Sequence, residues 1–389
     1  MNQNCPVCGQ TATKAVLSTP PLPVNSCVLT RSQEIALRFP RATMDLLGCE
    51  YCGFVWNASF DEEVVVYDQS YEGTQIHSAH FRAYLRGMAA EWLANVGGAP
   101  ASILEVGCGQ GEFLSTLAEL TSARLVGYDP AFRGLAPGGV EIIAERLPGA
   151  VDQSFDLVIN RMTLEHIPHP RRFIQTMTEW LAPGGTLITQ VPNAARTIDE
   201  GVACDLFYEH VNCFTQTSLG QLHRSVGLRH ISFETGFDHQ HLTAFAQRAP
   251  DFGAGDTQPR SANRFQRLTS AIRTFSAQWP SHLEALRASG REIWVWGAGS
   301  RATTFITLLP DPSLVSGVVD INPARDGTFV LGSACQTHTP RALAGRDNLA
   351  VIVMNPIYMT EIATELAAIQ ASAVLVPLKQ GQPDKPPSQ

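Results

Sequence analysis

The chain lacks a long apolar segment and any concentration of basic charge. No apolar run approaches the roughly 20 residues that a membrane-spanning helix needs, and the first ten residues, MNQNCPVCGQ, hold no hydrophobic signal core. Its 28 Lys and Arg residues are scattered and are outnumbered by 36 Asp and Glu residues. These absences argue against a membrane or a nucleic acid as partner, and we expect a cytoplasmic protein.

Length and composition indicate a folded protein of more than one domain. Hydrophobic residues make up 44% of the chain and charged residues 16%, which excludes wholesale disorder. A chain of 389 residues is too long for one compact core. We expect three domains over residues 1–75, 76–250 and 264–380, with a Gly-, Pro- and Ser-containing linker at Asp251–Asn263 and a disordered polar tail.

Four of the nine cysteines form two widely separated C-x-x-C pairs. A glycine follows each pair and lets the backbone fold toward the sulfurs. Two such pairs supply the four thiolates of a tetrahedral structural zinc and leave no open position for catalysis. Redox-active pairs are the alternative. The sequence therefore predicts a structural Zn²⁺ held by Cys5, Cys8, Cys49 and Cys52.

Strand and helix patterns alternate after the cysteine region. Short strand-like pieces at Ile35–Phe39 and Phe54–Asn57 join the cysteine pairs, and helical periodicity covers Phe81–Val96. The alternation that follows indicates a parallel sheet with helices on both faces. The predicted elements of this middle region are strands at Ile103–Val106, Leu125–Tyr128, Phe155–Ile159 and Thr186–Gln190, and helices at Glu112–Leu120 and Arg171–Leu181.

A long helix over Arg264–Ser289 leads to a second unit of the same kind. We therefore expect two Rossmann-like sheets in one chain. The predicted elements are strands at Ile293–Trp296, Val315–Val319, Ala350–Met354 and Ala373–Val376, and helices from Arg301 and at Thr360–Ile369.

A glycine-rich turn joins the first predicted strand of the middle region to the next helix. Glycines are needed there because the backbone bends sharply and a Cβ would block a ligand lying against the turn. Asp129 ends the following strand, where a carboxylate can accept both hydroxyls of a ribose. The residues predicted to form this cofactor turn are Gly107, Cys108, Gly109 and Gly111.

The middle region resembles the class I S-adenosylmethionine (SAM)-dependent methyltransferases. The matching segments are Glu105–Gly111, Phe155–Val158, Leu164–Pro168 and Leu181–Leu187, in that order along the chain. A dinucleotide-dependent dehydrogenase is the competing interpretation. Besides the turn and Asp129, the resemblance implies cofactor contacts from Glu105, Glu145, Asn160 and His166.

The whole arrangement is similar to that of the sugar C-methyltransferases, which act on nucleotide-linked keto-deoxysugars. The best local match is Tyr208–Thr215, which contains the Glu–His pair of the family's active site. Forming a carbon nucleophile requires a base beside a ketone, and a histidine suits that role near neutral pH. We expect His210 to be this base, with Glu209 orienting it or sharing the role. Strand capping or substrate binding without proton transfer is the alternative.

A tyrosine after the cysteine module also belongs to that family's active site. Tyr67 and Tyr71 are the candidates, and the spacing does not decide between them. Either phenol could donate a hydrogen bond to the developing enolate oxygen. Packing between the cysteine module and the middle region is the alternative role.

A second glycine turn lies in the C-terminal half, and a carboxylate ends the next strand. The resemblance implies that this half binds the nucleotide-sugar substrate, with its diphosphate at the turn. An NAD-type site and a purely structural turn are the alternatives. The residues predicted to bind substrate are Gly297, Gly299, Ser300, Arg301 and Asp320.

Two departures from the family pattern leave the substrate open. The family's His-Gly-Gly segment is replaced by Asp238–Thr243, and Thr303 stands near the position of a family lysine in the second turn. Arg301 is expected to supply the missing positive charge.

We therefore predict an α/β protein with a zinc module, a SAM-binding sheet and a C-terminal Rossmann-like half, acting as a monomer or small homo-oligomer on a small molecule. The predicted activity is C-methylation of a nucleotide-linked keto sugar. O- or N-methylation of another metabolite and a non-catalytic scaffold are the alternatives.

Overall fold

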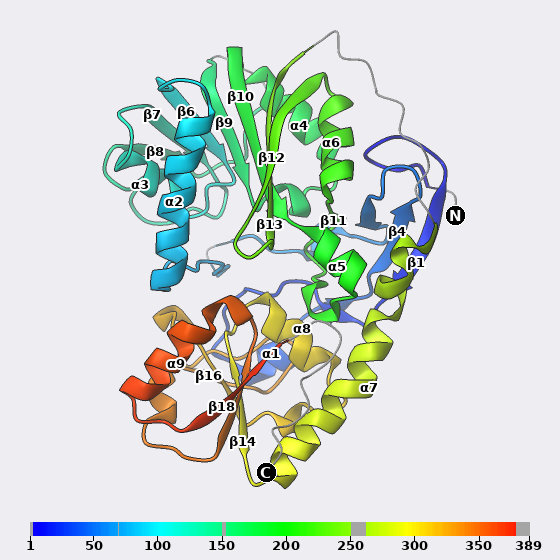
Figure 1. Ribbon diagram of the computed structural model, residues 1–389, viewed down its shortest axis with the longest axis vertical. Helices are drawn as coiled ribbons and strands as arrows, with labels where there is room; N and C mark the ends of the chain where they lie inside the picture. The colour runs from blue at the N-terminus through cyan, green and yellow to red at the C-terminus, as the bar shows by residue number, and fades with distance from the viewer. Residues whose placement is uncertain (1–2, 69, 150–152, 250–261, 379–389) are drawn as a thin grey trace.

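A computed structural model of the chain describes residues 3–68, 70–149, 153–249 and 262–378. Three main sheets follow one another along the chain, and the second and third lie in separate halves of the molecule (Figure 1). Nearly all of the predicted linker and the polar tail lie outside the described residues.

The N-terminal region forms a small antiparallel sheet in the order β1-β4-β5-β11. Its last strand comes from far along the chain, because Asn212 pairs with Trp56. The prediction of a strand over Phe54–Asn57 is confirmed by β5. The elements of this region are β1 (Thr13–Ser18), β2 (Leu22–Pro23), α1 (Gln33–Arg38), β3 (Arg41–Ala42), β4 (Asp45–Cys49), β5 (Val55–Asn57) and β11 (Asn212–Cys213).

The predicted strand over Ile35–Phe39 is wrong, because this segment forms the helix α1. Its N-cap Ser32 accepts a hydrogen bond from the Ile35 amide at 3.3 Å. Glu34 and Arg38 form an ion pair one helical turn apart at 2.8 Å. These local interactions favour a helix even though its apolar side chains alternate as in a strand.

The middle region is a seven-stranded sheet in the order β12-β13-β10-β9-β6-β7-β8. The strands β6 to β10 pair in parallel; four of them, β6, β7, β9 and β10, correspond to predicted strands, and β8 was not predicted. The strand β13 runs antiparallel to β10, and β12 runs antiparallel to β13. The strands are β6 (Ser102–Val106), β7 (Arg124–Tyr128), β8 (Val140–Ile143), β9 (Phe155–Arg161), β10 (Leu181–Pro192), β12 (Leu228–Gly236) and β13 (His241–Arg248).

Helices cover both faces of this sheet (Figure 1). On one face Ile174 of α4 and Leu219 of α6 are fully buried in a common core. On the other face Trp92 of α2 packs edge-on against Phe113 of α3, with ring centroids 5.3 Å apart. The helices on these faces are α2 (Ala79–Asn95), α3 (Glu112–Ala118), α4 (Pro170–Glu179) and α6 (Gln216–Arg224), whereas α5 (Ala194–Glu200) lies in the core shared with the C-terminal half.

The C-terminal half is a five-stranded sheet in the order β16-β15-β14-β17-β18, with every pair parallel. The prediction of a second Rossmann-like unit agrees with this topology. Its elements are α7 (Gln266–Ala288), β14 (Glu292–Trp296), α8 (Ser300–Leu308), β15 (Gly317–Val319), β16 (Thr337–His338), β17 (Leu349–Val353), α9 (Met359–Ala368) and β18 (Ala373–Pro377).

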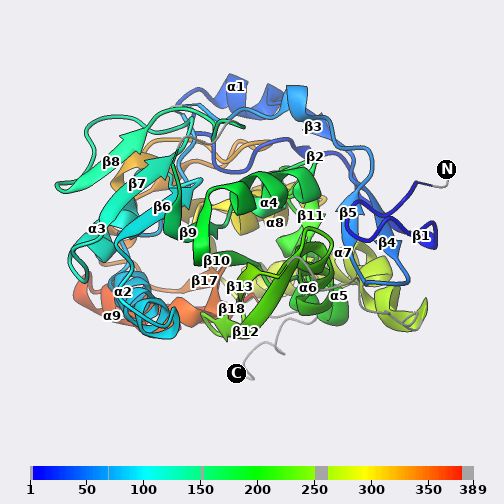
Figure 2. The ribbon, with the colours of Figure 1, turned by 90° about the horizontal axis from the view of Figure 1, so that it is seen from above.

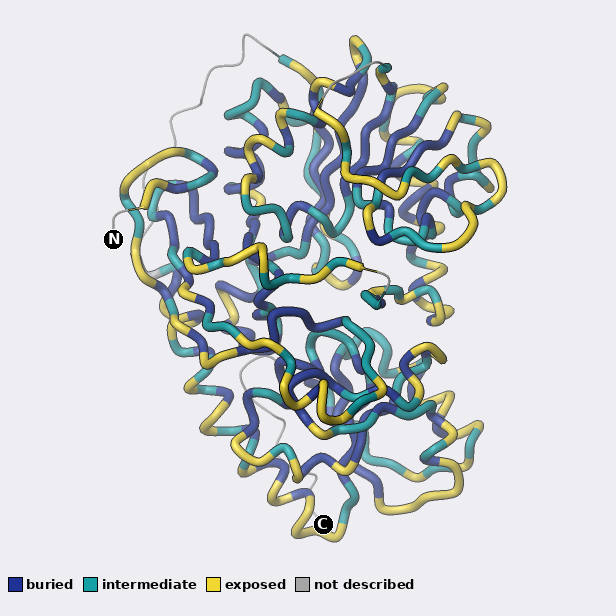
Figure 3. Tube along the Cα trace, turned by 180° about the vertical axis from the view of Figure 1, so that it is seen from behind, coloured by how far each residue is buried: buried dark blue, intermediate teal, exposed yellow. Residues whose placement is uncertain are grey.

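The N-terminal region shares its core with the C-terminal half. Val24 and Leu46 belong to the same buried cluster as Phe275 of α7 and Val295 of β14. The helix α7 runs from beside β1 to the C-terminal sheet (Figures 1 and 2). Buried residues, dark blue in Figure 3, are found both in the N-terminal region and in the C-terminal half. The N-terminal region therefore packs on both halves, because Cys5 and Phe54 belong to the core of the middle region.

No helix within the described ranges is both long enough and apolar enough to cross a membrane.

Candidate active site

The two C-x-x-C pairs meet in one cluster. Cys5 Sγ lies 3.7 Å from Cys52 Sγ, and Cys8 Sγ lies 3.5 Å from Cys49 Sγ. All four sulfurs lie within 4.8 Å of one another. Zinc–sulfur bonds of about 2.3 Å in a tetrahedron would separate the sulfurs by about 3.8 Å. The geometry therefore fits one tetrahedral metal ion.

The cysteine module also holds the segment that contains His210. Besides the pairing of β11 with β5, the Asn57 amide donates to the carbonyl of Val211 at 2.9 Å. The Asp61 amide donates to the hydroxyl of Tyr208 at 2.9 Å. The position of the Glu–His pair therefore depends on the folding of the cysteine module.

The first glycine turn connects β6 to α3 with left-handed backbone at each glycine. The φ angles are 75° at Gly107, 56° at Gly109 and 78° at Gly111, a region that side chains disfavour. A Cβ at Gly107 or Gly111 would collide with Thr163 or Ile142, whereas a Cβ at Gly109 would meet nothing within 4 Å. Of the three glycines, then, only Gly109 faces open space, and the other two allow close packing of the protein itself.

Asp129 holds this turn through hydrogen bonds to two backbone amides. Its Oδ2 accepts from the Gly109 amide at 2.7 Å, and its Oδ1 accepts from the Ala131 amide at 2.8 Å. Each carboxylate oxygen retains a further lone pair for a ligand hydroxyl. Asp129 therefore combines the predicted position for a ribose with a structural role that the sequence did not indicate.

Two buried acceptors beside the turn have no partner. Glu105 Oε2 and Asn160 Oδ1 are inaccessible to solvent and make no hydrogen bond with any residue that the structure describes. Glu105 lies 3.6 Å from Arg161, yet burial raises the pKa of its carboxyl to about 7. Unsatisfied buried acceptors are costly. An ammonium group, such as that of a methionine moiety, is a suitable partner for acceptors of this kind, so the residues present fit SAM.

Three other predicted cofactor contacts lie in different surroundings. Glu145 is exposed, two residues beyond β8. Cys108 is buried next to Gly127, where any side chain would meet its sulfur. His166 belongs to a cluster with Tyr67 and His210.

Tyr67, His166 and His210 are brought together from three parts of the chain. The Tyr67 hydroxyl lies 2.6 Å from His166 Nδ1, which also lies 3.0 Å from the carbonyl of Glu209. Because a carbonyl only accepts, that contact requires a proton on Nδ1. The Tyr67 oxygen then accepts from the same N–H group, and the phenol proton is free for another acceptor.

Burial keeps these groups uncharged. It lowers the pKa of His166 to about 4 and, together with the neighbouring His166, lowers the pKa of His210 well below its usual value. Burial also raises the pKa of Tyr67 well above its usual value. The His166 and His210 rings meet edge-on with centroids 4.7 Å apart. The cluster thus offers a neutral imidazole and a protonated phenol.

The carboxylate of Glu209 has partners other than His210. Its Oε2 accepts from Asn25 Nδ2 at 3.1 Å, and its Oε1 accepts from the amide and the hydroxyl of Ser26. If Glu209 orients His210, it therefore does so through the backbone that joins the two residues and not through its carboxylate. Tyr71 packs edge-on against Tyr67 at 5.3 Å, and burial raises its pKa well above the usual value. Asn25 and Ser26 carry no motif that could have identified them from the sequence.

A cavity of about 680 Å³ lies between the two halves. Such a volume is typical of small-molecule sites. His210 lines it from the middle region, and Phe237 and His241 line it from the β12–β13 hairpin. The predicted substrate residues Gly297, Gly299, Ser300, Arg301 and Asp320 line it from the C-terminal half.

Asp320 holds the second glycine turn in the same way, through hydrogen bonds to two backbone amides. Asp320 Oδ2 accepts from the Ala298 amide at 2.7 Å, and its Oδ1 accepts from the Asn322 amide at 2.8 Å. The predicted replacement cation is engaged elsewhere, because Arg301 Nε donates to Asp205 Oδ1 at 2.6 Å and Nη2 donates to Oδ2 at 3.3 Å. Thr303 is buried and donates to the carbonyl of Ser26.

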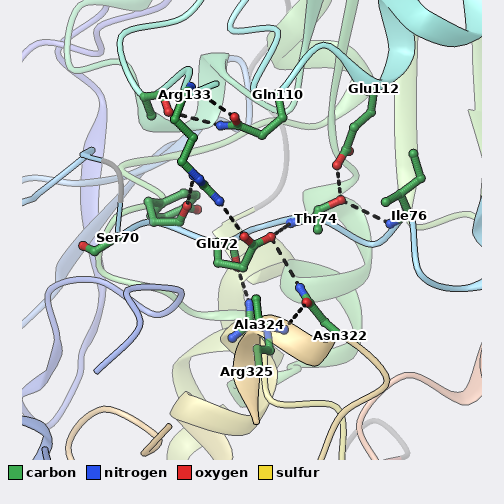
Figure 4. A network of polar contacts seen from close by, with 12 residues as sticks. Ser70, Glu72, Thr74, Ile76, Gln110, Glu112, Arg133, Asn322, Ala324 and Arg325 are labelled. Atoms are coloured by element: carbon green, nitrogen blue, oxygen red, sulfur yellow. Dashed lines mark hydrogen bonds and ion pairs between the residues drawn. The ribbon is translucent and has the colours of Figure 1, made fainter. Parts of the chain in front are cut away.

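A buried carboxylate joins the loops that follow the two aspartates (Figure 4). Glu72 accepts from Arg133 at 2.6 Å on the side of the first turn and from Asn322 at 3.4 Å on the side of the second. The backbone carbonyl of Glu72 accepts from Arg325. The segment between the cysteine module and α2 therefore bridges both halves, which no sequence motif indicated.

Comparison with known proteins agrees with this division of the chain. Residues 79–232 match the family model described as a methyltransferase domain, and residues 255–377 match the C-methyltransferase C-terminal domain. The middle region of the chain is thus similar to methyltransferase domains. This region contains the first glycine turn and His210, and the C-methyltransferase C-terminal domain contains the second turn.

Individual relatives cover parts of the chain. Trans-aconitate 2-methyltransferase of Streptomyces avermitilis is 33% identical over 106 residues, which are 24% of this chain and 39% of that protein. C-methyltransferase NovU of Streptomyces niveus is 27% identical over 206 residues, which are 49% of this chain and 48% of that protein. The chain thus spans less than half the length of these relatives. A SAM-dependent methyltransferase structure from Clostridium acetobutylicum aligns with 43% of this chain and 92% of its own, with 8% identity and a TM-score of 0.35.

Proposed function

We propose that the protein is a SAM-dependent C-methyltransferase that acts on a nucleotide-linked keto sugar. The observation that carries the proposal is the position of His210: its neutral ring lines a cavity that also borders the C-terminal half. When bound at the first turn, SAM supplies an electrophilic methyl group. The C-methyltransferase NovU and the C-methyltransferase C-terminal domain support carbon as the acceptor.

In this proposal His210 takes the proton from the carbon beside the ketone, the electron pair of that C–H bond forms the carbon–carbon double bond of the enolate, and the π pair of the carbonyl moves to its oxygen. The phenol of Tyr67 donates to this oxygen, with His166 fixing its position. The enolate carbon then forms the bond to the methyl group, while the carbon–sulfur bond breaks and its electron pair stays on sulfur. Because burial keeps the His210 ring unprotonated, the ring is available to accept this proton.

The proposal also includes a structural Zn²⁺ held by Cys5, Cys8, Cys49 and Cys52. The distances between the sulfurs support it. Four thiolate ligands leave no position for substrate. The metal would act on the reaction only through the strand pairing that holds the segment with His210.

A screen of thymidine- and uridine-linked keto sugars with ¹³C-methyl SAM tests this function. We expect the label on carbon, and exchange of the neighbouring hydrogen in D₂O when S-adenosylhomocysteine (SAH) replaces SAM. Label on oxygen or nitrogen, without carbon–hydrogen exchange, would refute carbon transfer and favour methylation of another metabolite.

A further inference from the structure

The arginines that line the cavity differ in whether their guanidinium groups are already paired with other groups of the protein. Arg301 is held by both carboxylate oxygens of Asp205. Arg325 donates to the carbonyls of Ala298 and Glu72. Both guanidinium groups are therefore committed within the protein.

Arg196 on α5 lines the same cavity and is not committed. Within the described ranges its guanidinium makes no hydrogen bond or ion pair. Its Nη1 atom is buried and has no hydrogen-bond partner among the described residues. An unpaired donor on a charged group in such a position is unfavourable unless a ligand pairs with it. Arg341 also lines the cavity, but it is exposed, so water can solvate its charge.

Of the four carboxylates that line the cavity, Glu365 is exposed and the other three are engaged. Asp205 is paired with Arg301, and Asp320 accepts from two loop amides. Glu361 accepts from the hydroxyl of Ser78 and the amide of Ala79. The unpaired charge of Arg196 therefore remains available for an anion from outside the chain.

We infer that Arg196 binds the diphosphate of the nucleotide-linked substrate, and that Arg301 does not. This inference rests on the proposed function, which requires an acceptor with its reactive carbon at His210 in the same cavity. A planar guanidinium presents two parallel donors that match phosphate oxygens. The cavity of about 680 Å³ also has room for a nucleotide portion next to the C-terminal turn.

Calorimetry on the full-length protein saturated with SAH tests the inference, with thymidine diphosphate, uridine diphosphate and the matching nucleosides as probes. We expect R196Q to weaken the nucleoside diphosphate that binds wild type by about 10- to 100-fold, as loss of a charged hydrogen-bonded pair would. R196K should fall between the two. Nucleoside binding should be equal in wild type and R196Q, and R341Q should change diphosphate affinity less than about threefold.

Several results would overturn it. Equal diphosphate affinity in wild type and R196Q would do so, as would a wild type that binds SAH but neither nucleoside diphosphate. Without ligands, R196Q should melt at or above the wild-type temperature, because it loses an unpaired buried donor. A melting temperature several degrees lower would mean that Arg196 serves the fold instead. Failure of wild type to bind SAH at all would instead refute the proposed function.

Discussion

An aspartate holds each of the two glycine turns of this chain by the same pair of hydrogen bonds, but the groups around the two turns differ. In both, the aspartate that ends the next strand accepts from a turn amide through one oxygen and from a following loop amide through the other. Beside the first turn, two buried acceptors lack partners. Beside the second, the side chain of Arg301 is already paired with Asp205. The shared motif thus describes how the loop is built, and the neighbouring groups determine which ligand it can take.

The largest effect is expected where the two halves face each other, at His210. Replacing His210 by Ala should lower turnover by roughly 10²- to 10⁴-fold, because a general base contributes about that much. SAH affinity should stay within about threefold of wild type, measured by calorimetry. His169→Ala, which changes an exposed histidine nearby, is the matched control. Turnover within threefold of wild type in H210A would remove His210 from the mechanism.

The second test compares the two aspartates directly. Asp129→Ala should weaken SAH binding by about 100-fold, since it removes both the hydrogen bond to Gly109 and the acceptors for a ribose. Asp320→Ala should leave SAH binding unchanged. Equal losses in the two variants, or a loss confined to D320A, would mean that the turns are assigned to the wrong ligands.

The third test removes one of the four predicted zinc ligands of the cysteine module. We expect Cys8→Ser to lose the metal and to lower the melting temperature by roughly 5–10 °C, because four-thiolate zinc sites stabilise the folded state. Turnover should fall with it, since β11 and Glu209 depend on the module. Metal content, melting temperature and turnover check this. An unchanged metal content in C8S would exclude a four-cysteine site.

The smallest effect concerns the unpaired acceptor of the first turn. Burial raises the pKa of Glu105 to about 7, so the carboxyl ionises as the pH rises through 7. An ionised carboxylate attracts the ammonium of SAM more strongly. We expect SAM affinity, relative to that of Glu105→Gln, to rise several-fold between pH 6 and 8.

The same pKa shift has a consequence for ligand-free stability. Because the folded state holds this proton to higher pH than the unfolded state, Glu105 favours folding below its usual pKa and loses this advantage as the pH rises to about 7. Thermal melts of wild type and E105Q at several pH values measure the difference. Parallel pH curves for the two proteins would contradict the burial of an ionisable group at this position.

The parallel strands, both glycine turns and the cysteine pairs could be predicted because each depends on a local pattern. The helix α1 could not, since Ile35 and Leu37 alternate as in a strand but are 57% and 49% exposed while Ala36 between them is buried. The hairpin β12–β13 carries polar and charged residues on a half-buried edge strand, so its pattern is weak.

The site itself was predictable only in part. The sequence indicated His210 and, without deciding between them, Tyr67 and Tyr71, but their arrangement depends on contacts between distant segments. Asn25 and Ser26 bind Glu209 across more than 180 residues of chain. The pairing of Arg301 with Asp205 likewise joins separate regions and engages the guanidinium that was expected to supply a positive charge to the substrate. Such pairings carry no spacing rule that a single sequence could reveal.

A crystal structure of the protein grown with SAH tests the central assignment most directly. We expect the adenosine ribose at Asp129, with the amino group of the ligand within hydrogen-bonding distance of Glu105 or Asn160. Adenosine bound at Gly297–Gly299 with its ribose on Asp320, and the first turn empty, would contradict the assignment of the two turns.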